Sequence, residues 1–320
     1  MPAPNLVHTD SVLSRMATGF PVSEGIADWI FPTVLVKKQS DLYTIFDAAR
    51  VGSKQVKDER APGGRAKNVD FDTSQGTFNC VDHRLEVKIT DEELSNEDLP
   101  LRAMSDKVAV AVNNLRINQE IDAAATLITD ITGSQTATPS VNWAIANWAT
   151  SEPITDIETG INQIASACGR KPNIGWCDSL VWQALRRHPD LVDLVKYTGT
   201  NNSLGQPGTQ GIADYFGLDE IRVVAAFKNI AVPGVDTPSM SRIWGDDFWL
   251  QYRTTDPEPR KTIPSACYKF VWQPFSASDG FEVVSEYDKL AKVTEMAVGR
   301  YYDQETILTQ ATYRIADVLT

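Results

Sequence analysis

LRAMSDKVAVAVNNLRINQEIDAAATLIT (101–129) is the stretch of this sequence that decides the fold. Its apolar side chains recur at spacings of three and four residues, as one face of a helix requires. They form a first stripe and then a shifted second one: Leu101, Met104, Val108, Ala111 and Leu115, followed by Ile117, Ile121, Ala124 and Ile128. At 1.5 Å per residue the helix is about 43 Å long, which is unusual inside a domain of about 150 residues. Asp98 is placed to cap it, and Pro100 suits its first turn.

Upstream of this helix, residues 37–90 predict a long two-stranded ribbon. DLYTIFDAARV (41–51) is typical of a strand, and TFNCVDHRLEVKIT (77–90) alternates as strands do. The residues between them, 52–76, are rich in turn formers and charge. A disordered loop is the competing interpretation, since connections of this length often have no structure of their own. The strands at both ends favour the ribbon, which cannot form a core alone and has to lie on something else.

Two short segments concentrate opposite charge. Between residues 50 and 67 there are six basic and two acidic residues, a local net charge of +4 in a chain of net charge −12. The basic residues are Arg50, Lys54, Lys57, Arg60, Arg65 and Lys67. DEELSNED (91–98) holds five carboxylates, those of Asp91, Glu92, Glu93, Glu97 and Asp98. Both sets are candidate contacts between molecules, because complementary charge sets register and association rate.

The remaining elements indicate an α+β protein. The first 28 residues lack periodicity and are expected to form an arm, and WIFPTVLV (29–36), with Pro32 inside it, suits an edge strand. From residue 154 the elements are shorter: a helix ending near Gly169, a strand at 173–177, and a helix that Asp178 caps. Strands are expected at 220–227 and in the later segments, with a helix at 290–297.

Composition excludes several classes of protein. The 320 residues are 42% apolar and 22% charged, as in soluble globular proteins. The acidic balance argues against a general nucleic-acid binder. No apolar run approaches the roughly 20 residues that span a bilayer, and the opening MPAPNLVHTD lacks the features of a secretory signal. Four cysteines are too few for a disulfide scaffold, so we expect a soluble protein, made in the cytosol, with reduced thiols.

The search for catalytic chemistry finds no nucleophile, phosphate-binding or metal motif. Cys80 and His83 have the spacing of half a zinc site, but residues three apart on a strand face opposite ways. His188, preceding Pro189, is expected among cations at a helix C-terminus, where the macrodipole favours them. Asp246 and Asp247 are expected to face apart in a solvated bend. We therefore expect no catalytic residues, cofactor or metal.

This order of parts resembles the major capsid proteins of tailed bacteriophages with the Hong Kong 97-type fold. The quoted features are the basic, glycine-containing loop DERAPGGRAKNVDFD (58–72), the strand and acidic turn LEVKITDEEL (85–94), and the helix LVWQALRRHPDLVDLV (180–195) before the strand EIRVVAAF (220–227). The resemblance implies five parts. They are an N-terminal arm (1–36), an extended two-stranded loop (37–90), a spine helix and peripheral domain (91–153), an axial domain (154–262), and return strands of both domains (263–320).

The resemblance also implies a function. Copies of the chain are expected to form pentamers and hexamers of an icosahedral virion head, made in the host bacterial cytoplasm, which encloses double-stranded DNA without sequence-specific binding. Expected partners are a separate scaffolding protein, a portal and decoration proteins, and no membrane. In some members a loop lysine is joined covalently to a neighbour, but no pattern selects one of the lysines here. Two alternatives stay open: an encapsulin-like compartment shell and an α/β enzyme with dispersed catalytic residues.

Overall fold

The computed structural model describes residues 8–9, 25–46, 59–60, 62–65, 73–96, 100–196, 208–231, 239–254, 265–275 and 280–320. Its helices are α2 (Ala27–Ile30), α4 (Asp91–Asn96), α5 (Pro100–Asp130), α6 (Pro153–Cys168), α7 (Ser179–Leu185), α8 (Pro189–Lys196) and α9 (Thr209–Phe216). Its strands are β1 (His8–Thr9), β2 (Thr33–Val36), β3 (Ser40–Phe46), β4 (Thr73–Asn79), β5 (Val81–Thr90), β6 (Thr136–Ala137), β7 (Ile174–Asp178), β8 (Glu220–Val224), β9 (Phe227–Asn229), β10 (Met240–Arg242), β11 (Phe248–Gln251), β12 (Cys267–Trp272), β13 (Glu282–Asp288), β14 (Val293–Thr306) and β15 (Thr312–Ile315). In the described part of the chain, no helix has the length and hydrophobicity needed to cross a bilayer.

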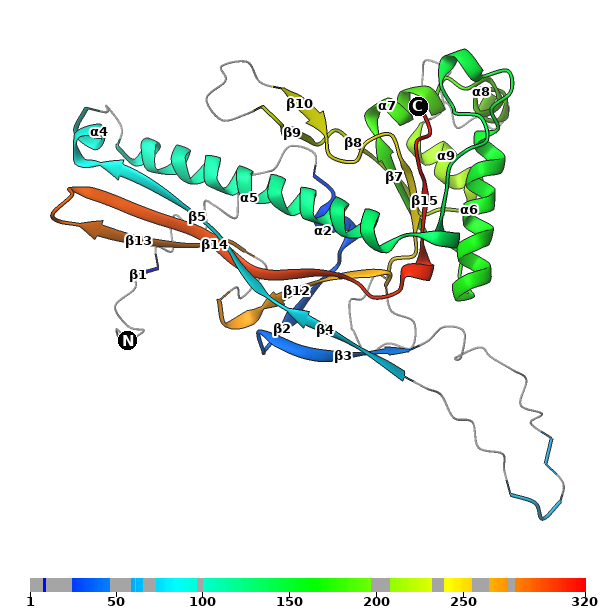
Figure 1. Cartoon of the computed structure of the whole chain (residues 1–320), viewed down its shortest axis with the longest axis horizontal. Coiled ribbons are helices and arrows are strands. Elements are labelled where there is room, and N and C mark those ends of the chain that lie inside the picture. Colours follow the sequence, from blue (N-terminus) through cyan, green and yellow to red (C-terminus); the bar gives the residue numbers. More distant parts are fainter. Residues whose placement is uncertain are drawn as a thin grey trace.

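Helix α5 confirms the long helix that the apolar spacing predicts, and it begins at Pro100. Val108 and Val112 pack with residues of β5, β13 and β14 in one core. Ala124 and Leu127 belong to a second, larger core that includes α6 and β7. A helix about 46 Å long therefore joins two cores, and its apolar stripe shifts because its two halves face different neighbours (Figure 1).

A long sheet lies along α5 (Figure 1). Its strand order is β1-β13-β14-β12-β2, and β5 pairs with β14 as well. Strands β5 and β14 are antiparallel from Thr90–Val293 to Val81–Tyr302. The helix expected at 290–297 is wrong, because β14 begins at Val293 and has strand partners on both sides. Its alternately buried Met296 and Val298 complete the core with α5, and this packing overrides local propensity.

The two-stranded ribbon is present as β3 and β4, which pair from Ser40–Asn79 to Phe46–Thr73. Its base is held by an aromatic stack in which Phe78 and Phe270 have ring centroids 4.6 Å apart. Strand β5 leaves the ribbon after Cys80 and joins the long sheet instead. The described pairing of the ribbon therefore ends at Asn79, short of residue 90, where the expected extended loop ends.

The second sheet has the strand order β6-β15-β11-β7-β8. Asp178 caps α7 by accepting from the Leu180 N–H at 2.9 Å, and Gly169 ends α6 with a φ of 72°, as the sequence predicts. Trp176 and Trp249 stack within its core, with ring centroids 5.7 Å apart. Because β15 comes from the end of the chain, this sheet is assembled from segments far apart in sequence.

The segment 29–36 behaves partly as expected. Strand β2 is an edge strand and pairs with β12 in parallel, which confirms the edge prediction. The preceding Trp29 and Ile30 are helical, in α2, rather than part of the strand. This short helix packs against α5 and brings the N-terminal segment into the larger core.

Candidate functional site

The described part of the basic segment lies at a chain reversal. Arg60 and Arg65 are exposed on either side of a turn, where Gly63 has a φ of +79° that favours glycine. We call residues 59–60 and 62–65 the ribbon tip, and Figure 1 shows it beyond the free end of β3 and β4. Arg50, Lys54, Lys57 and Lys67 lie outside the described residues.

The acidic segment begins a short helix. Asp91, Glu92 and Glu93 form the first turn of α4, while Glu97 and Asp98, with its expected cap, lie outside the described residues. The Thr90 N–H donates to Glu93 Oε2, and the Glu93 N–H donates to Thr90 Oγ1, both at 3.2 Å. This reciprocal pair is a capping box, so the sequence that supplies negative charge also starts the helix.

Two of the three described carboxylates of α4 are engaged within the chain. Glu93 accepts from Lys107 Nζ at 2.8 Å, and Asp91 accepts from the Tyr287 hydroxyl at 2.6 Å. Glu92 is exposed. Helix α4 and the ribbon tip lie at opposite ends of the molecule (Figure 1). Within one chain, the described residues of the acidic and basic segments therefore lie far apart.

Cys80 and His83 lie in different surroundings. Cys80 is buried with the ribbon base, and burial raises the pKa of its thiol to about 12. His83 stacks on Tyr302, with ring centroids 4.1 Å apart. Within the described ranges, three potential metal ligands approach one another only at Asp246, Asp247 and Asp317. Asp246 and Asp247 lie at a turn, as expected, but the expectation that they face apart and are solvated is wrong, because both belong to this group and Asp247 is buried.

Asp247 is buried and has structural partners. It accepts from Arg314 Nε at 2.7 Å and from the Asp317 N–H at 3.1 Å. Burial raises the pKa of its carboxyl, while Arg314 opposes that shift. The ion pair between Asp247 and Arg314 joins β15 to the turn before β11. These contacts stabilise the C-terminal segment rather than bind a substrate.

His188 follows the C-terminal end of α7, as expected, but the expectation that it is a cation there is wrong, because its side chain is buried. Its Nε2 lies 3.0 Å from the Ser151 hydroxyl, and its Nδ1 lies 3.6 Å from an Asp190 oxygen. The order serine, histidine, aspartate is that of a hydrolase triad. Ser151 is only 3% exposed and His188 is fully buried. Burial lowers the pKa of His188. A substrate has no access to this serine, so the contact serves packing.

The polar residues that sequence reasoning missed lie where α2 meets α5. Glu120 is buried and accepts three hydrogen bonds, from the N–H groups of Ile26 and Ala27 at 2.9 and 2.8 Å and from Trp244 Nε1 at 2.7 Å. Burial raises the pKa of its carboxyl, although these donors favour the ionised form. One carboxylate thereby attaches the N-terminal segment to the long helix and to the larger core.

A second polar cluster lies beside it. Asp28 accepts from Lys269 Nζ at 2.7 Å and from Gln119 Nε2 at 2.6 Å, and Arg300 donates to Gln119 Oε1. Burial would raise the pKa of Asp28, but Lys269 and Arg300 hold it well below its usual range. Lys269 is the one charged residue in the apolar run CYKFVW (267–272). A charged residue in such a run is the sequence signal that could have indicated a buried ion pair.

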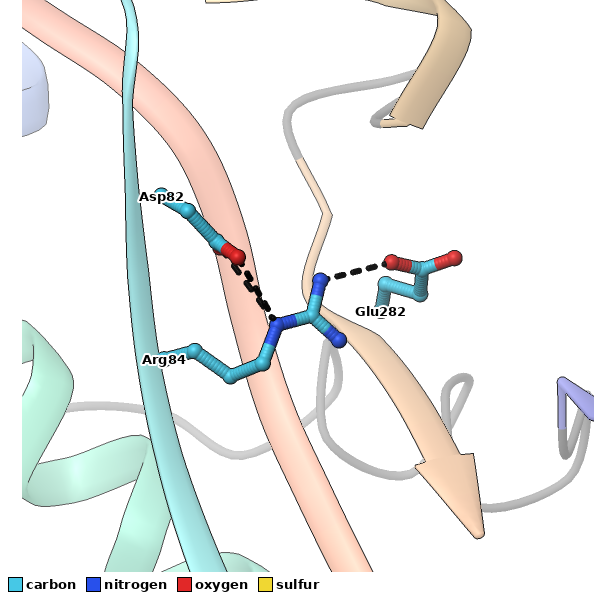
Figure 2. Close-up of polar contacts among 3 residues, drawn as sticks. All are labelled: Asp82, Arg84 and Glu282. Carbon is cyan, nitrogen blue, oxygen red and sulfur yellow. Dashed lines mark hydrogen bonds and ion pairs between the residues drawn. The ribbon is translucent and has the colours of Figure 1, made fainter. Parts of the chain in front are cut away.

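A third missed feature crosses the long sheet. Gly299 of β14 lies in register between Arg84 of β5 and Glu282 of β13. The Arg84 side chain crosses β14, donates to Glu282 at 3.0 Å, and donates to Asp82 at 3.2 Å (Figure 2). A Cβ at Gly299 would lie 2.7 Å from the His83 carbonyl oxygen. The glycine therefore allows both the close strand pairing and the ion pair across it.

Comparison with known proteins agrees with this architecture. No family model matches the sequence. The chain is 24% identical to the major capsid protein of Pseudomonas phage JBD67, covering 76% of this chain and 77% of that protein. It is 25% identical to the major capsid protein of Burkholderia phage BcepMu, covering 76% of each.

Solved structures share the fold over nearly the whole chain. A phage-related protein from Bordetella bronchiseptica RB50 superimposes with a TM-score of 0.69 at 23% identity, covering 98% of both chains. The capsid of cyanophage P-SCSP1u gives 0.61 at 10% identity, covering 93% of this chain and 89% of that one. A virus-like particle from Pyrococcus furiosus gives 0.55 at 11% identity, covering 95% and 96%. The chain has the α+β capsid fold of Hong Kong 97-like structures.

Proposed function

We infer that the chain is the major capsid protein of a tailed bacteriophage, a structural subunit and not an enzyme, whose copies form the icosahedral virion head. The observation that carries this conclusion is the match to two phage major capsid proteins over three quarters of the chain. The capsid fold supports it independently, since that fold extends over 93% of the chain at only 10% identity.

We propose that the subunit has the five parts that the capsid resemblance implies. Residues 1–36 act as the arm and α5 as the spine. The extended loop, expected at 37–90, is shortened here to 37–80 because β5 pairs with β14 in the long sheet. The long sheet acts as the peripheral domain. The 263–320 return strands contribute to both domains, since β12, β13 and β14 lie in the long sheet and β15 lies in the second sheet. The sheet around β7 and β11, mainly within residues 154–262, acts as the axial domain. The support is the presence of two hydrophobic cores joined by α5.

We also propose that subunits within a pentamer or hexamer contact one another through the charged segments. The basic segment (50–67) of one copy meets the acidic segment (91–98) of another. The ribbon tip and α4 lie at opposite ends of the chain (Figure 1), so contact between them requires two copies. The full basic set is Arg50, Lys54, Lys57, Arg60, Arg65 and Lys67, and the full acidic set is Asp91, Glu92, Glu93, Glu97 and Asp98. Exposed ion pairs contribute only about 0.2–1 kcal/mol each, so the shell gains stability from their number and from apolar burial.

Further partners belong to the same proposal. Scaffolding, portal and decoration proteins act with the shell, and double-stranded DNA is enclosed without sequence-specific binding. The net charge of −12 supports the last point, because an acidic wall holds few cations that would bind packaged phosphates.

The test is the particle mass of the purified protein at micromolar concentration, by sedimentation and negative-stain imaging. We expect closed shells, or rings of five or six subunits. The double variant R60E/R65E should stay folded and form no shells. The variant K171E/R187E, which makes the same charge change at exposed residues of the axial domain, is the control and should assemble. A monomer that stays unassembled when scaffolding protein is co-expressed would contradict the function, and normal shells from R60E/R65E would contradict the electrostatic contact.

A compartment shell is the second candidate function. It is supported by the shared fold of the virus-like particle from Pyrococcus furiosus. The contents of native particles separate the two functions. Enclosed double-stranded DNA supports a phage head, whereas enclosed enzymes without DNA support a compartment.

A further inference from the structure

The base of the ribbon packs against one face of the long sheet of the same chain. Tyr43 of β3 stacks on Phe270 of β12, with ring centroids 5.5 Å apart. The N–H of Asn79, at the end of β4, donates to Asp303 Oδ2 of β14 at 2.7 Å. Aromatic packing and a hydrogen bond to a carboxylate therefore attach the ribbon base to the sheet.

Glu305 lies on the face of the sheet that the ribbon base covers. It follows Asp303 by two residues on β14, so both side chains point to the same face. Its partner in register is Tyr268 of β12, which shares a core with Phe78 of the ribbon. Ile307, two residues further along the chain, belongs to the same core. A carboxyl group is therefore placed among the side chains on which the ribbon rests.

The charged groups that act on Glu305 are both negative. They are Asp303 and Asp130, the last residue of α5. Within the described ranges, none of these three carboxylates forms an ion pair. Burial, with the two neighbouring carboxylates, raises the pKa of Glu305 to about 7. The groups facing it from β3 and β12 are the hydroxyls of Tyr43 and Tyr268, and burial raises the pKa of both, so they are neutral at pH 7. Ionising Glu305 beneath the ribbon is therefore unfavourable.

We propose that Glu305 is a proton-dependent switch that controls the attachment of the ribbon base to the long sheet. With a proton on Glu305 the base stays docked. Loss of the proton favours an open state, in which the base separates from β14 and water solvates the carboxylates. In that open state the carboxyl returns to its ordinary pKa of 4.5, so the docked state binds the proton more tightly. Opening should therefore increase as the pH rises from about 4.5 to about 7, and level off above that range.

Amide hydrogen exchange of the unassembled subunit measures this opening. The protection factor of the Asn79 N–H, corrected for the pH dependence of intrinsic exchange, reports the contact with Asp303. In the parent protein it should fall by about tenfold to a hundredfold between pH 5 and pH 8. Each unit of difference in pKa gives a tenfold change, and the partial exposure of Glu305 weakens the response.

Two glutamine variants test whether Glu305 is the group that titrates. In E305Q the side chain carries no titrating proton, so the protection factor of Asn79 should change by less than about threefold over the same pH range. E286Q neutralises an exposed glutamate of β13 in the same sheet and should respond like the parent protein. Equal pH responses in the parent protein and E305Q would overturn the proposal.

A third variant separates charge from packing. D130N removes one of the two charges that act on Glu305, so the midpoint of the opening should move to lower pH. A midpoint that stays at the parental pH would overturn the electrostatic origin of the switch. Equal opening constants for Asn79 and for Leu250 of β11 would overturn the proposal as well, because the ribbon base would then separate only when the whole subunit unfolds. The proposal goes beyond the capsid function and is independent of it, since exchange is measured on single subunits and gives its answer whether or not shells form.

Discussion

Replacing Glu120 tests how the N-terminal segment is attached to the subunit. The carboxylate accepts from two backbone N–H groups at the start of α2 and from the Trp244 indole. In the variant E120A these three donors lose their acceptor, and each buried donor left unpaired costs about 1–3 kcal/mol. Glu120 borders a cavity of about 310 Å³ from which water can reach part of the site. We therefore expect E120A to lower the free energy of unfolding by about 3–6 kcal/mol.

The variant E120Q gives an intermediate case. Its amide oxygen can keep the position of Oε1, which accepts from Ile26 and Trp244, but its NH₂ group then faces the Ala27 N–H. One hydrogen bond is lost and two donors oppose each other, so the expected loss is about 1–3 kcal/mol. D106A, an exposed change on the same helix, should stay within about 0.5 kcal/mol of the parent protein.

The assay is urea unfolding of the unassembled subunit, combined with amide hydrogen exchange. Exchange at Ile26 and Ala27 should accelerate in E120A, because their N–H groups lose the acceptor that protects them. A loss below about 1 kcal/mol with unchanged exchange at both amides would refute the argument. Equal losses in E120A and D106A would refute it as well, since the cause would then not be the buried carboxylate.

Three further predictions concern the sheet and two titrating groups. G299V should cost about 2–4 kcal/mol in urea unfolding, because its Cβ meets the His83 carbonyl, whereas A297V on the same strand should cost less; equal costs would contradict this account. Burial lowers the pKa of His188, so stability should fall as the pH falls below about 6.5, and H188Q should remove that slope in thermal unfolding. Burial and neighbouring carboxylates raise the pKa of Glu305 to about 7 from 4.5, so its contribution to stability should fall as the pH rises between these values. E305Q should then unfold at a higher temperature than the parent protein at pH 8, and an unchanged or lower temperature would contradict the prediction.

The sequence by itself determined the elements that depend on local rules. The three-and-four spacing predicts α5 to within a residue or two, and Asp178 and Gly169 mark a helix start and a helix end where the structure has them. Alternation predicts one strand at 77–90, which the structure divides at Cys80 into the end of β4 and the whole of β5. These signals are readable because a helix or a capped turn is decided by residues a few positions apart. The order of these elements along the chain was also enough to indicate the resemblance to phage capsid proteins.

The tertiary structure alone decided which polar groups are buried and what they contact. Glu120 meets Ile26 across 94 residues of sequence, and Lys269 meets Asp28 across 241. The strand at 293–306 forms because β5 and β13 pair with it from distant parts of the chain. Local spacing carries no information about partners so far away. Burial changes the pKa and the hydrogen bonding of a side chain only after those partners surround it, so the buried carboxylates emerge only from the assembled fold.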